Sequence, residues 1–178
     1  MAEAALRQLQ LDVLHIIPTG QAWHKQRPLT PVQHRLAMTQ LAFAAMDRVK
    51  VDPRETLREG PSYTVETLLE LRDEYPAAQL FLIVGEDQAQ ALPTWYRWAE
   101  ITKLAIICVA ARAVPMGTGG TICQQFLAQP GFQRLDMPLV DVSATDIRRQ
   151  LATQQSVAPL VLEPVARYID YHLLYRSA

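Results

Sequence analysis

Hydrophobic residues along the chain alternate between short continuous runs and longer stretches in which they recur every three or four positions. Short apolar runs bounded by turn residues are typical of buried strands, and the wider spacing is typical of helices that bury one face. The short runs predict strands at residues 11–18, 48–55, 79–85, 104–111 and 138–142. The wider spacing predicts helices at residues 1–10, 30–46, 63–75, 94–102 and 122–128, a helix that begins at 143, and a terminal helix that begins at 159 or 164 and ends at 174.

Strands that alternate with helices in this way form parallel βαβ units with right-handed crossover connections. The expected fold class is therefore α/β, with a mostly parallel sheet that carries helices on both faces. Residues 79–85 and 104–111 are almost continuously apolar, as in strands that are buried on both sides. A chain of 178 residues fits one compact domain, so we expect residues 1–178 to form a single domain.

Two of the predicted helices begin with capping signals. Thr30 precedes Pro31, and Gln33 stands three positions after Thr30, which predicts a side-chain cap at Thr30. Ser143 is followed three positions later by Asp146, which is a variant of the capping box. Both helices should therefore begin at these positions.

Composition and charge exclude several classes of protein. The 17 basic and 18 acidic residues give a net charge of -1, which offers no cationic face for nucleic acid. No apolar stretch reaches about 18 residues and the N-terminus lacks a signal sequence, so we expect no membrane segment and a cytoplasmic location. The two cysteines do not make a disulfide framework, and Cys108, inside an apolar run, is expected to be a buried reduced thiol.

Polar side chains follow several of the predicted strands, where ligands of open α/β sheets bind. Gly85 ends the most apolar strand and would let a ligand approach closely, while Asp87 could accept hydrogen bonds from ribose hydroxyls or ring amines. Lys25 lies in the loop after the first predicted strand, where it could reach a phosphate or be solvated. These positions are candidates for a nucleotide site.

Two predicted helix starts could bind anions through their first amides. Ser143, Thr145 and Arg148 would place two hydroxyls and a guanidinium at one helix start, which suits a phosphate. An ordinary capped helix with a solvated arginine fits the same spacing. Tyr63 and Thr64 begin another such helix, where routine helix punctuation is the alternative.

Three aromatic residues lie within residues 95–98, and they cannot all face inward on one helix. Trp95 could stack on a heteroaromatic ring, or it could pack as a hydrophobic staple. Trp98, three residues later, is expected to lie in the core.

Taken together and in this order, these runs resemble the bacterial nicotinate mononucleotide adenylyltransferases, members of the nucleotidyltransferase superfamily with a Rossmann-like sheet. The resemblance covers nearly the whole chain and is most specific at residues 58–68, Arg-Glu-Gly-Pro-Ser-Tyr-Thr-Val-Glu-Thr-Leu, and 92–98, Leu-Pro-Thr-Trp-Tyr-Arg-Trp. It implies transfer of the adenylyl group of ATP to nicotinate mononucleotide, which gives deamido-NAD and pyrophosphate, with Mg²⁺ accompanying ATP.

The resemblance also implies roles for individual residues. Tyr63 and Thr64 would hold the nicotinate carboxylate, Trp95 would stack on the pyridine ring, and Arg112 would lie near the mononucleotide phosphate. The residues implied for ATP and its phosphates are Lys25, Gly85, Asp87, Ser143, Thr145 and Arg148. The partners are then small molecules, and the sequence leaves the oligomeric state open, a homo-oligomer included.

The chain departs from this family at its N-terminus. Family members begin with a strand ending in Gly-x-Phe-x-Pro-x-His-x-Gly-His, whose histidines bind the ATP phosphates, and no His-x-x-His occurs in this sequence. The first strand would lie centrally, between the strands predicted at 11–18 and 79–85. We therefore expect an N-terminally incomplete nucleotidyltransferase domain whose start was placed at an internal Met, with no catalytic residue assigned and with little activity.

Two other interpretations stay open. The chain could be another adenylyltransferase of the superfamily, acting on nicotinamide mononucleotide or a phosphopantetheine, although the runs at 60–65 and 94–98 argue against this. A non-catalytic nucleotide-binding or regulatory module would fit the absence of the two histidines.

Overall fold

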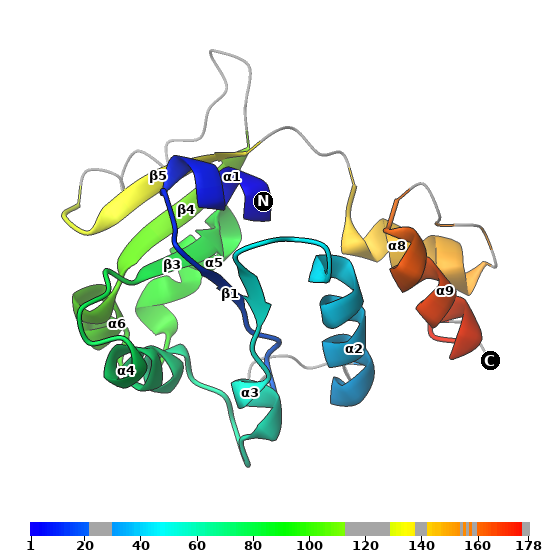
Figure 1. Ribbon diagram of the computed structural model, residues 1–178, viewed down its shortest axis with the longest axis horizontal. Coiled ribbons are helices and arrows are strands. Elements are labelled where there is room, and N and C mark those ends of the chain that lie inside the picture. Colours follow the sequence, from blue (N-terminus) through cyan, green and yellow to red (C-terminus); the bar gives the residue numbers. More distant parts are fainter. Residues whose placement is uncertain are drawn as a thin grey trace. The chain divides into compact units, whose positions relative to one another are not determined.

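The computed structural model describes residues 1–21, 30–112, 129–137, 142–153, 155, 157 and 160–175 (Figure 1). The chain divides into two compact units, each formed by two stretches of sequence. Unit 1 consists of Met1–Asp12 and Gly60–Leu139, and unit 2 of Val13–Glu59 and Val140–Ala178. The expectation of a single domain stays a prediction.

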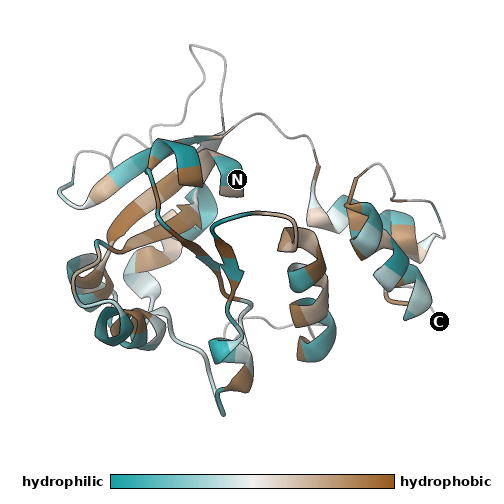
Figure 2. Ribbon diagram, in the orientation of Figure 1, coloured by the Kyte–Doolittle hydropathy of each residue, from teal (hydrophilic) through white to brown (hydrophobic). Residues whose placement is uncertain are grey.

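Unit 1 is built on a sheet of three parallel strands. Strand β4 (Ile106–Arg112) lies between β3 (Phe81–Gly85) and β5 (Phe132–Met137). The register aligns Phe81 with Ile106 and Ile107 with Phe132. Figure 2 shows the apolar character of β3 and β4, which agrees with the two-sided burial expected of parallel strands.

Helices cover both faces of the β3–β4–β5 sheet. Helix α1 (Ala2–Gln8) packs on one face, where its Ala5 joins Cys108 and Leu135 in a buried cluster. The other face contacts α4 (Thr64–Glu74), α5 (Glu86–Ala91), the 3-10 helix η1 (Leu92–Thr94) and α6 (Trp98–Leu104). Their buried residues, with those of β3 and β4 on that face, form the main core cluster: Val65, Leu68, Val84, Ala89, Leu92, Ile101, Ala105, Ile107 and Val109.

Unit 2 contains a sheet of two parallel strands, β1 (Leu14–Ile16) and β2 (Val49–Val51). Its helices are α2 (Val32–Phe43), α3 (Arg54–Leu57), α8 (Ala144–Ala152) and α9 (Glu163–Tyr171). Leu151, Val157 and Ile169 form a buried cluster here, and Met38 of α2 packs against it. Helices from both stretches of the unit therefore share one core.

The α/β class, the parallel strands and the helices on both faces of a sheet are confirmed. The strand predicted at 48–55 is wrong in its second half, because β2 ends at Val51 and α3 follows. Asp52 causes the change: its Oδ1 accepts a hydrogen bond from the Arg54 amide at 3.0 Å, which turns the chain just after the strand. The strand predicted at 11–18 is likewise shorter, since β1 covers three residues.

The region after β3 also differs from the prediction. Helix α5 begins directly at Glu86, where no helix was expected. The helix predicted at 94–102 begins only at Trp98, because Trp95 to Arg97 form a turn before it. Trp98 is 37% exposed, so the expectation that it lies in the core is wrong.

The two predicted caps have different outcomes. Ser143 caps α8, because its Oγ accepts a hydrogen bond from the Asp146 amide at 3.0 Å. Among the described residues, α2 has Pro31 as its N-cap and no side-chain cap hydrogen bond, so the cap predicted at Thr30 is wrong. The Thr30 carbonyl instead accepts a hydrogen bond from the Arg35 side chain.

Some predictions fall on residues that the structure does not describe. The helix predicted at 122–128 lies outside the described residues, as does most of the strand predicted at 138–142, while β5 occupies residues that were not predicted as a strand. Within the described residues, β1 pairs only with β2, and β3 only with β4. A further strand beside them stays a prediction. The described part of the chain contains no helix long and apolar enough to cross a membrane.

Candidate functional site

Two aromatic segments of unit 1 that lie 33 positions apart meet at the start of α4. The rings of Tyr63 and Tyr96 have centroids 4.6 Å apart and are tilted by 41°. Tyr63 and Trp95 are both partly buried and both pack against the main core cluster. Of the residues implied for nicotinate mononucleotide, Tyr63, Thr64 and Trp95 therefore lie on elements that share one core.

The turn between η1 and α6 gives Trp95 and Tyr96 different exposures. Arg97 adopts a left-handed backbone conformation with φ 53° and ψ 39°, which is uncommon for a residue with a side chain. Its Nη2 forms an ion pair with Oε2 of Glu100 at 2.6 Å in the first turn of α6. Trp95 packs against the core, whereas Tyr96 is 50% exposed. The turn thus places one aromatic side chain against the core and leaves the other exposed.

Helix α4 begins at Thr64, directly after Tyr63, with no side-chain cap hydrogen bond. Val65 and Thr67 are buried, which fixes the orientation of the first turn against the core. The first amides and the helix dipole of an eleven-residue helix favour a negative charge at this end. A carboxylate group would suit this position, with Tyr63 beside it.

Gly85 and Asp87 lie at the carboxyl end of β3. Apart from its two chain neighbours, no described residue has an atom within 4 Å of a Cβ built on Gly85, so the described part of the chain leaves the space beside this residue open. Asp87 is in the first turn of α5 and is exposed. The exposed carboxylate and the open space next to the strand end are consistent with a nucleotide that approaches the backbone here.

In unit 2, the start of α8 brings together Ser143, Thr145 and Arg148. Besides the capping bond of Ser143, Nη2 of Arg148 donates to Oγ1 of Thr145 at 3.4 Å. Arg148 is partly buried, whereas Thr145 and Ser143 are exposed. The guanidinium and both hydroxyls are therefore grouped at one helix start, as the sequence predicted.

The structure does not describe the side chains of two predicted site residues. Lys25 lies outside the described residues. Arg112 is the last residue of β4, where it pairs in register with Met137, but its side chain is outside the described part. Their roles stay predictions.

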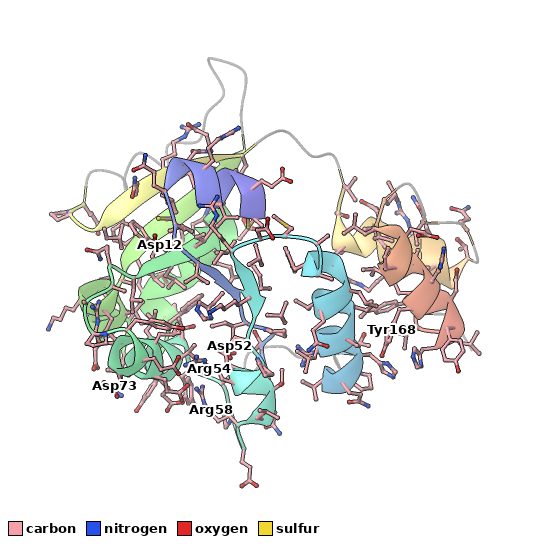
Figure 3. The ribbon with its side chains drawn as sticks, in the orientation of Figure 1. Asp12, Asp52, Arg54, Arg58, Asp73 and Tyr168 are labelled. Carbon is pink, nitrogen blue, oxygen red and sulfur yellow. The ribbon has the colours of Figure 1, made fainter. Side chains whose placement is uncertain are left out.

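The structure also reveals a charged cluster in unit 2 that the sequence analysis missed (Figure 3). Oδ2 of Asp52 accepts from Nε of Arg54 at 2.8 Å and lies 2.6 Å from its Nη2, and Nδ1 of His15 lies 3.4 Å from the same oxygen. Burial alone would raise the pKa of Asp52, but the hydrogen bonds from Arg54 and the charges of Arg54 and His15 together lower it. The Asp52-Pro53-Arg54 turn was the available signal.

A second missed residue is Arg35 of α2, whose guanidinium donates to three backbone carbonyls. Burial lowers the pKa of Arg35. The described residues contain no group of three or more His, Cys, Asp or Glu side chains that could hold a metal ion.

Comparison of the chain with known protein families identifies the family to which it belongs. Residues 1–150 match the cytidylyltransferase-like family, and the chain belongs to that family. Within it, the chain belongs with the nicotinate-nucleotide adenylyltransferases. A protein of Albidiferax ferrireducens named "Probable nicotinate-nucleotide adenylyltransferase" is 57% identical over all of this chain and 90% of the relative. A Methylibium petroleiphilum protein of the same name is 40% identical over 98% of this chain and 84% of its own length.

Solved structures share the fold of this chain. A Plasmodium falciparum nicotinic acid mononucleotide adenylyltransferase complexed with NaAD has a TM-score of 0.75 over 98% of this chain and 88% of that protein. The same enzyme complexed with APC has a TM-score of 0.70 over 95% of this chain and 85% of that protein. Both are 14% identical to this chain. At that identity the likeness establishes the Rossmann-like nucleotidyltransferase fold.

Proposed function

We propose that this protein transfers the adenylyl group of ATP to nicotinate mononucleotide, giving deamido-NAD and pyrophosphate. The observation that carries the proposal is 57% identity, across the whole chain, to a relative named for this activity. Two contacts support the proposal: Tyr63 lies against Tyr96, and Tyr63 and Trp95 pack against the same core cluster.

The reaction needs positioning more than it needs a protein nucleophile. A phosphate oxygen of nicotinate mononucleotide attacks the α-phosphorus of ATP, and the bond from that phosphorus to the bridging oxygen of the β-phosphate breaks. The oxygen leaves with pyrophosphate, so the acceptor already carries the nucleophile. Catalysis then rests on aligning the two phosphates and on neutralising the charge that moves between them.

For nicotinate mononucleotide, we assign the start of α4 to the carboxylate. Tyr63 directly precedes this helix and Thr64 is its first residue, and the dipole favours an anion at this end. Trp95 would stack on the pyridine ring, and Arg112 would neutralise the mononucleotide phosphate. A nicotinamide ring lacks the negative charge, so this end of the helix would discriminate between the two rings.

For ATP, we assign the ribose and base to the open carboxyl end of β3, with Gly85 and Asp87. Ser143, Thr145 and Arg148 would hold the phosphates, with Lys25 as an additional cation. Enzymes of this superfamily generally use divalent metal ions, and we propose that Mg²⁺ enters with ATP as part of the substrate. Magnesium held mainly by substrate phosphates and water needs few protein ligands.

The test is an assay of pyrophosphate release with ATP and nicotinate mononucleotide. It uses the 178-residue chain and, alongside it, the chain extended by any residues that the genome encodes in frame before Met1. Formation of deamido-NAD by either form supports the proposal. If neither form gives product, the proposal is overturned. Preference for nicotinamide mononucleotide in a competition assay would overturn the substrate, and product with a phosphopantetheine would assign another activity.

A further inference from the structure

The turn between η1 and α6 has an unusual backbone conformation at its third residue. The Trp98 amide donates to the carbonyl of Trp95 at 3.1 Å and closes a four-residue turn. Arg97 is the third residue of this turn, and its φ of 53° is in the left-handed region, which favours glycine or asparagine at such a position. The steric cost of this conformation at an arginine has to be offset by contacts of the turn.

The guanidinium of Arg97 binds one carboxylate oxygen through two of its nitrogens. Its Nε donates to Oε2 of Glu100 at 2.8 Å, and its Nη2 lies 2.6 Å from the same oxygen. Glu100 is in the first turn of α6, so the pair joins the turn to a regular helix. The guanidinium carbon also lies 6.0 Å from the ring centroid of Tyr96, at the outer limit for a cation–π contact. The ion pair is therefore the stronger of these two contacts.

An ion pair at this exposure contributes little to global stability, but here it acts on the choice between turn conformations. The side chains of Arg97 and Glu100 are 43% and 35% exposed, so solvent screens their attraction. The steric cost of a left-handed conformation at a residue with a Cβ atom is of the same order as the contribution of one such pair. Loss of the pair should therefore let the turn populate other conformations without unfolding the protein.

Tyr96 is the side chain whose orientation depends most on this turn. Its ring is tilted by 41° against that of Tyr63, with centroids 4.6 Å apart. Tyr63 directly precedes α4, whose start is assigned above to the nicotinate carboxylate. Tyr96 is 50% exposed, whereas Trp95 packs against the core cluster. The contact of Tyr96 with Tyr63 therefore depends on the backbone of the turn more than on burial.

An alternative role for Glu100 is to stabilise α6 alone. A carboxylate at the third residue of a helix interacts favourably with the helix dipole and commonly accepts from the amide of the capping residue. Here Oε2 of Glu100 accepts from the side chain of Arg97, which is the N-cap residue. The two roles can be separated, because an effect on the helix dipole does not need the guanidinium of Arg97.

We propose that Arg97 and Glu100 form a positioning pair for nicotinate mononucleotide. The pair holds the backbone of Arg97 in its left-handed conformation, and this keeps Tyr96 against Tyr63 beside the start of α4. The inference rests on the proposed function, which assigns this helix start and Trp95 to the same substrate. Neither member of the pair touches substrate in this proposal.

The experiment compares Arg97→Gln, Glu100→Gln and Arg97→Gly with the wild-type protein. Each glutamine variant removes the charge of one partner, whereas glycine adopts the left-handed conformation without steric cost. Glu163→Gln is the matched control, because Glu163 forms an exposed ion pair with Arg167 in α9.

Two readouts separate the position of the ring from its effect on the reaction. The first is the NMR nuclear Overhauser effect between the ring protons of Tyr63 and Tyr96 in the full chain, which needs no activity. The second is kcat and the KM for each substrate, measured in an active form of the chain.

We expect both glutamine variants to weaken the Overhauser effect between the two rings. They should raise the KM for nicotinate mononucleotide by about three- to fivefold, as the loss of an exposed ion pair allows. The KM for ATP and kcat should stay close to the wild-type values. Arg97→Gly should restore both readouts, because glycine needs no ion pair to keep its φ positive. The Glu163→Gln control should match the wild type.

An unchanged Overhauser effect in both glutamine variants would overturn the proposal. A weaker effect with an unchanged KM for nicotinate mononucleotide also rejects it, because the ring contact then has no part in binding. A loss in Glu100→Gln alone would assign Glu100 to α6, and a glycine variant as impaired as Arg97→Gln would exclude an action through the backbone. If the wild type is inactive, the proposed function fails, and the Overhauser effect still decides whether the pair positions Tyr96.

Discussion

The side-chain amide of Gln8 is hydrogen-bonded at both ends to the backbone of Asp136. Nε2 of Gln8 donates to the Asp136 carbonyl at 2.8 Å, and Oε1 of Gln8 accepts from the Asp136 amide at 3.0 Å. A residue of α1 therefore satisfies two backbone groups of β5 in the way that a neighbouring strand would. Within the described residues β5 is an edge strand of its sheet, and this contact satisfies backbone groups on part of that strand.

We predict that Gln8→Met lowers the free energy of unfolding by about 1 kcal/mol, because two net hydrogen bonds are lost at an exposed position. Methionine has a helix propensity similar to that of glutamine and keeps the stem of the side chain, so α1 itself should be unaffected. Urea unfolding measures the change. Arg7→Met, on the same helix, is the control for a lost polar side chain. An equal effect of both substitutions would mean that the contact with Asp136 contributes nothing.

The contact between Asp52 and Arg54 predicts a loss of stability in acid. The lowered pKa of Asp52 means that its ionised form is favoured by folding. Its contribution is present above the unfolded pKa, about 3.9, and is lost as the pH falls through the lower folded value. We expect Asp52→Asn to destabilise the protein by about 1.5 to 3 kcal/mol at pH 7 and to flatten the dependence of stability on pH below about 4.

Chemical unfolding between pH 7 and pH 2.5 tests this prediction. Asp136→Asn is the control, because Asp136 is exposed and its side chain is paired with Arg134 at the surface. Wild type and Asp52→Asn should converge at the acid end of the range. A constant gap between them at every pH would show that the ionisation of Asp52 is not coupled to folding.

The proposed stacking of Trp95 on the pyridine ring predicts a selective loss of affinity for nicotinate mononucleotide. Stacking on an aromatic side chain contributes about 1 to 3 kcal/mol, which corresponds to about 5- to 150-fold in affinity. We expect Trp95→Ala to raise the KM for nicotinate mononucleotide by such a factor and to leave the KM for ATP nearly unchanged.

Trp98→Ala is the matched control for this measurement, because Trp98 is a nearby and more exposed tryptophan. Since Trp95 also packs against the core cluster, the melting temperature of each variant is measured first, and the assays are run well below it. A parallel rise in both KM values would assign Trp95 to packing and not to the pyridine ring.

Burial of Cys108 predicts a slow reaction with alkylating reagents. Its side chain is fully buried between α1 and the sheet, and burial raises the pKa of its thiol to about 11. At pH 8 only about a thousandth of such a thiol is ionised, and the thiolate is the reactive form. In a Cys123→Ser variant, iodoacetamide should label Cys108 slowly in buffer and rapidly in urea. Equal rates in both would show that the core opens freely.

The elements that the sequence predicted well are those whose pattern reflects burial on both sides. Strands β3 and β4 are continuous apolar runs and were identified directly. Strand β5 was missed because it buries Leu135 fully while Gln133, Arg134 and Asp136 stay exposed. Helix α3 was missed because a local hydrogen bond from the Arg54 amide to the Asp52 side chain redirects the chain, and this depends on a single contact.

The candidate site was predictable where it depended on local order along the chain and not where it depended on distant contacts. The capped start of α8 follows from the spacing of Ser143 and Asp146. The meeting of Tyr63 with Tyr96 depends on the packing of α4 against α6, which no local pattern encodes. The contact of Asp52 with His15 and the contacts of Arg35 with Thr19 and Gly20 depend on partners far along the chain, so only the local Asp52-Pro53-Arg54 turn offered a signal.

The two roles given to Ser143, as the cap of α8 and as a phosphate ligand, can be separated by substitution. Ser143→Ala removes both functions, and we expect it to destabilise the protein by about 1 kcal/mol and to raise the KM for ATP. Ser143→Asn keeps a good capping group, so we expect it to restore the melting temperature. Because asparagine places no hydroxyl at this position, the KM for ATP should stay raised. Recovery of both properties in the asparagine variant would mean that Ser143 acts only through the cap, and the phosphates would then depend on Thr145 and Arg148.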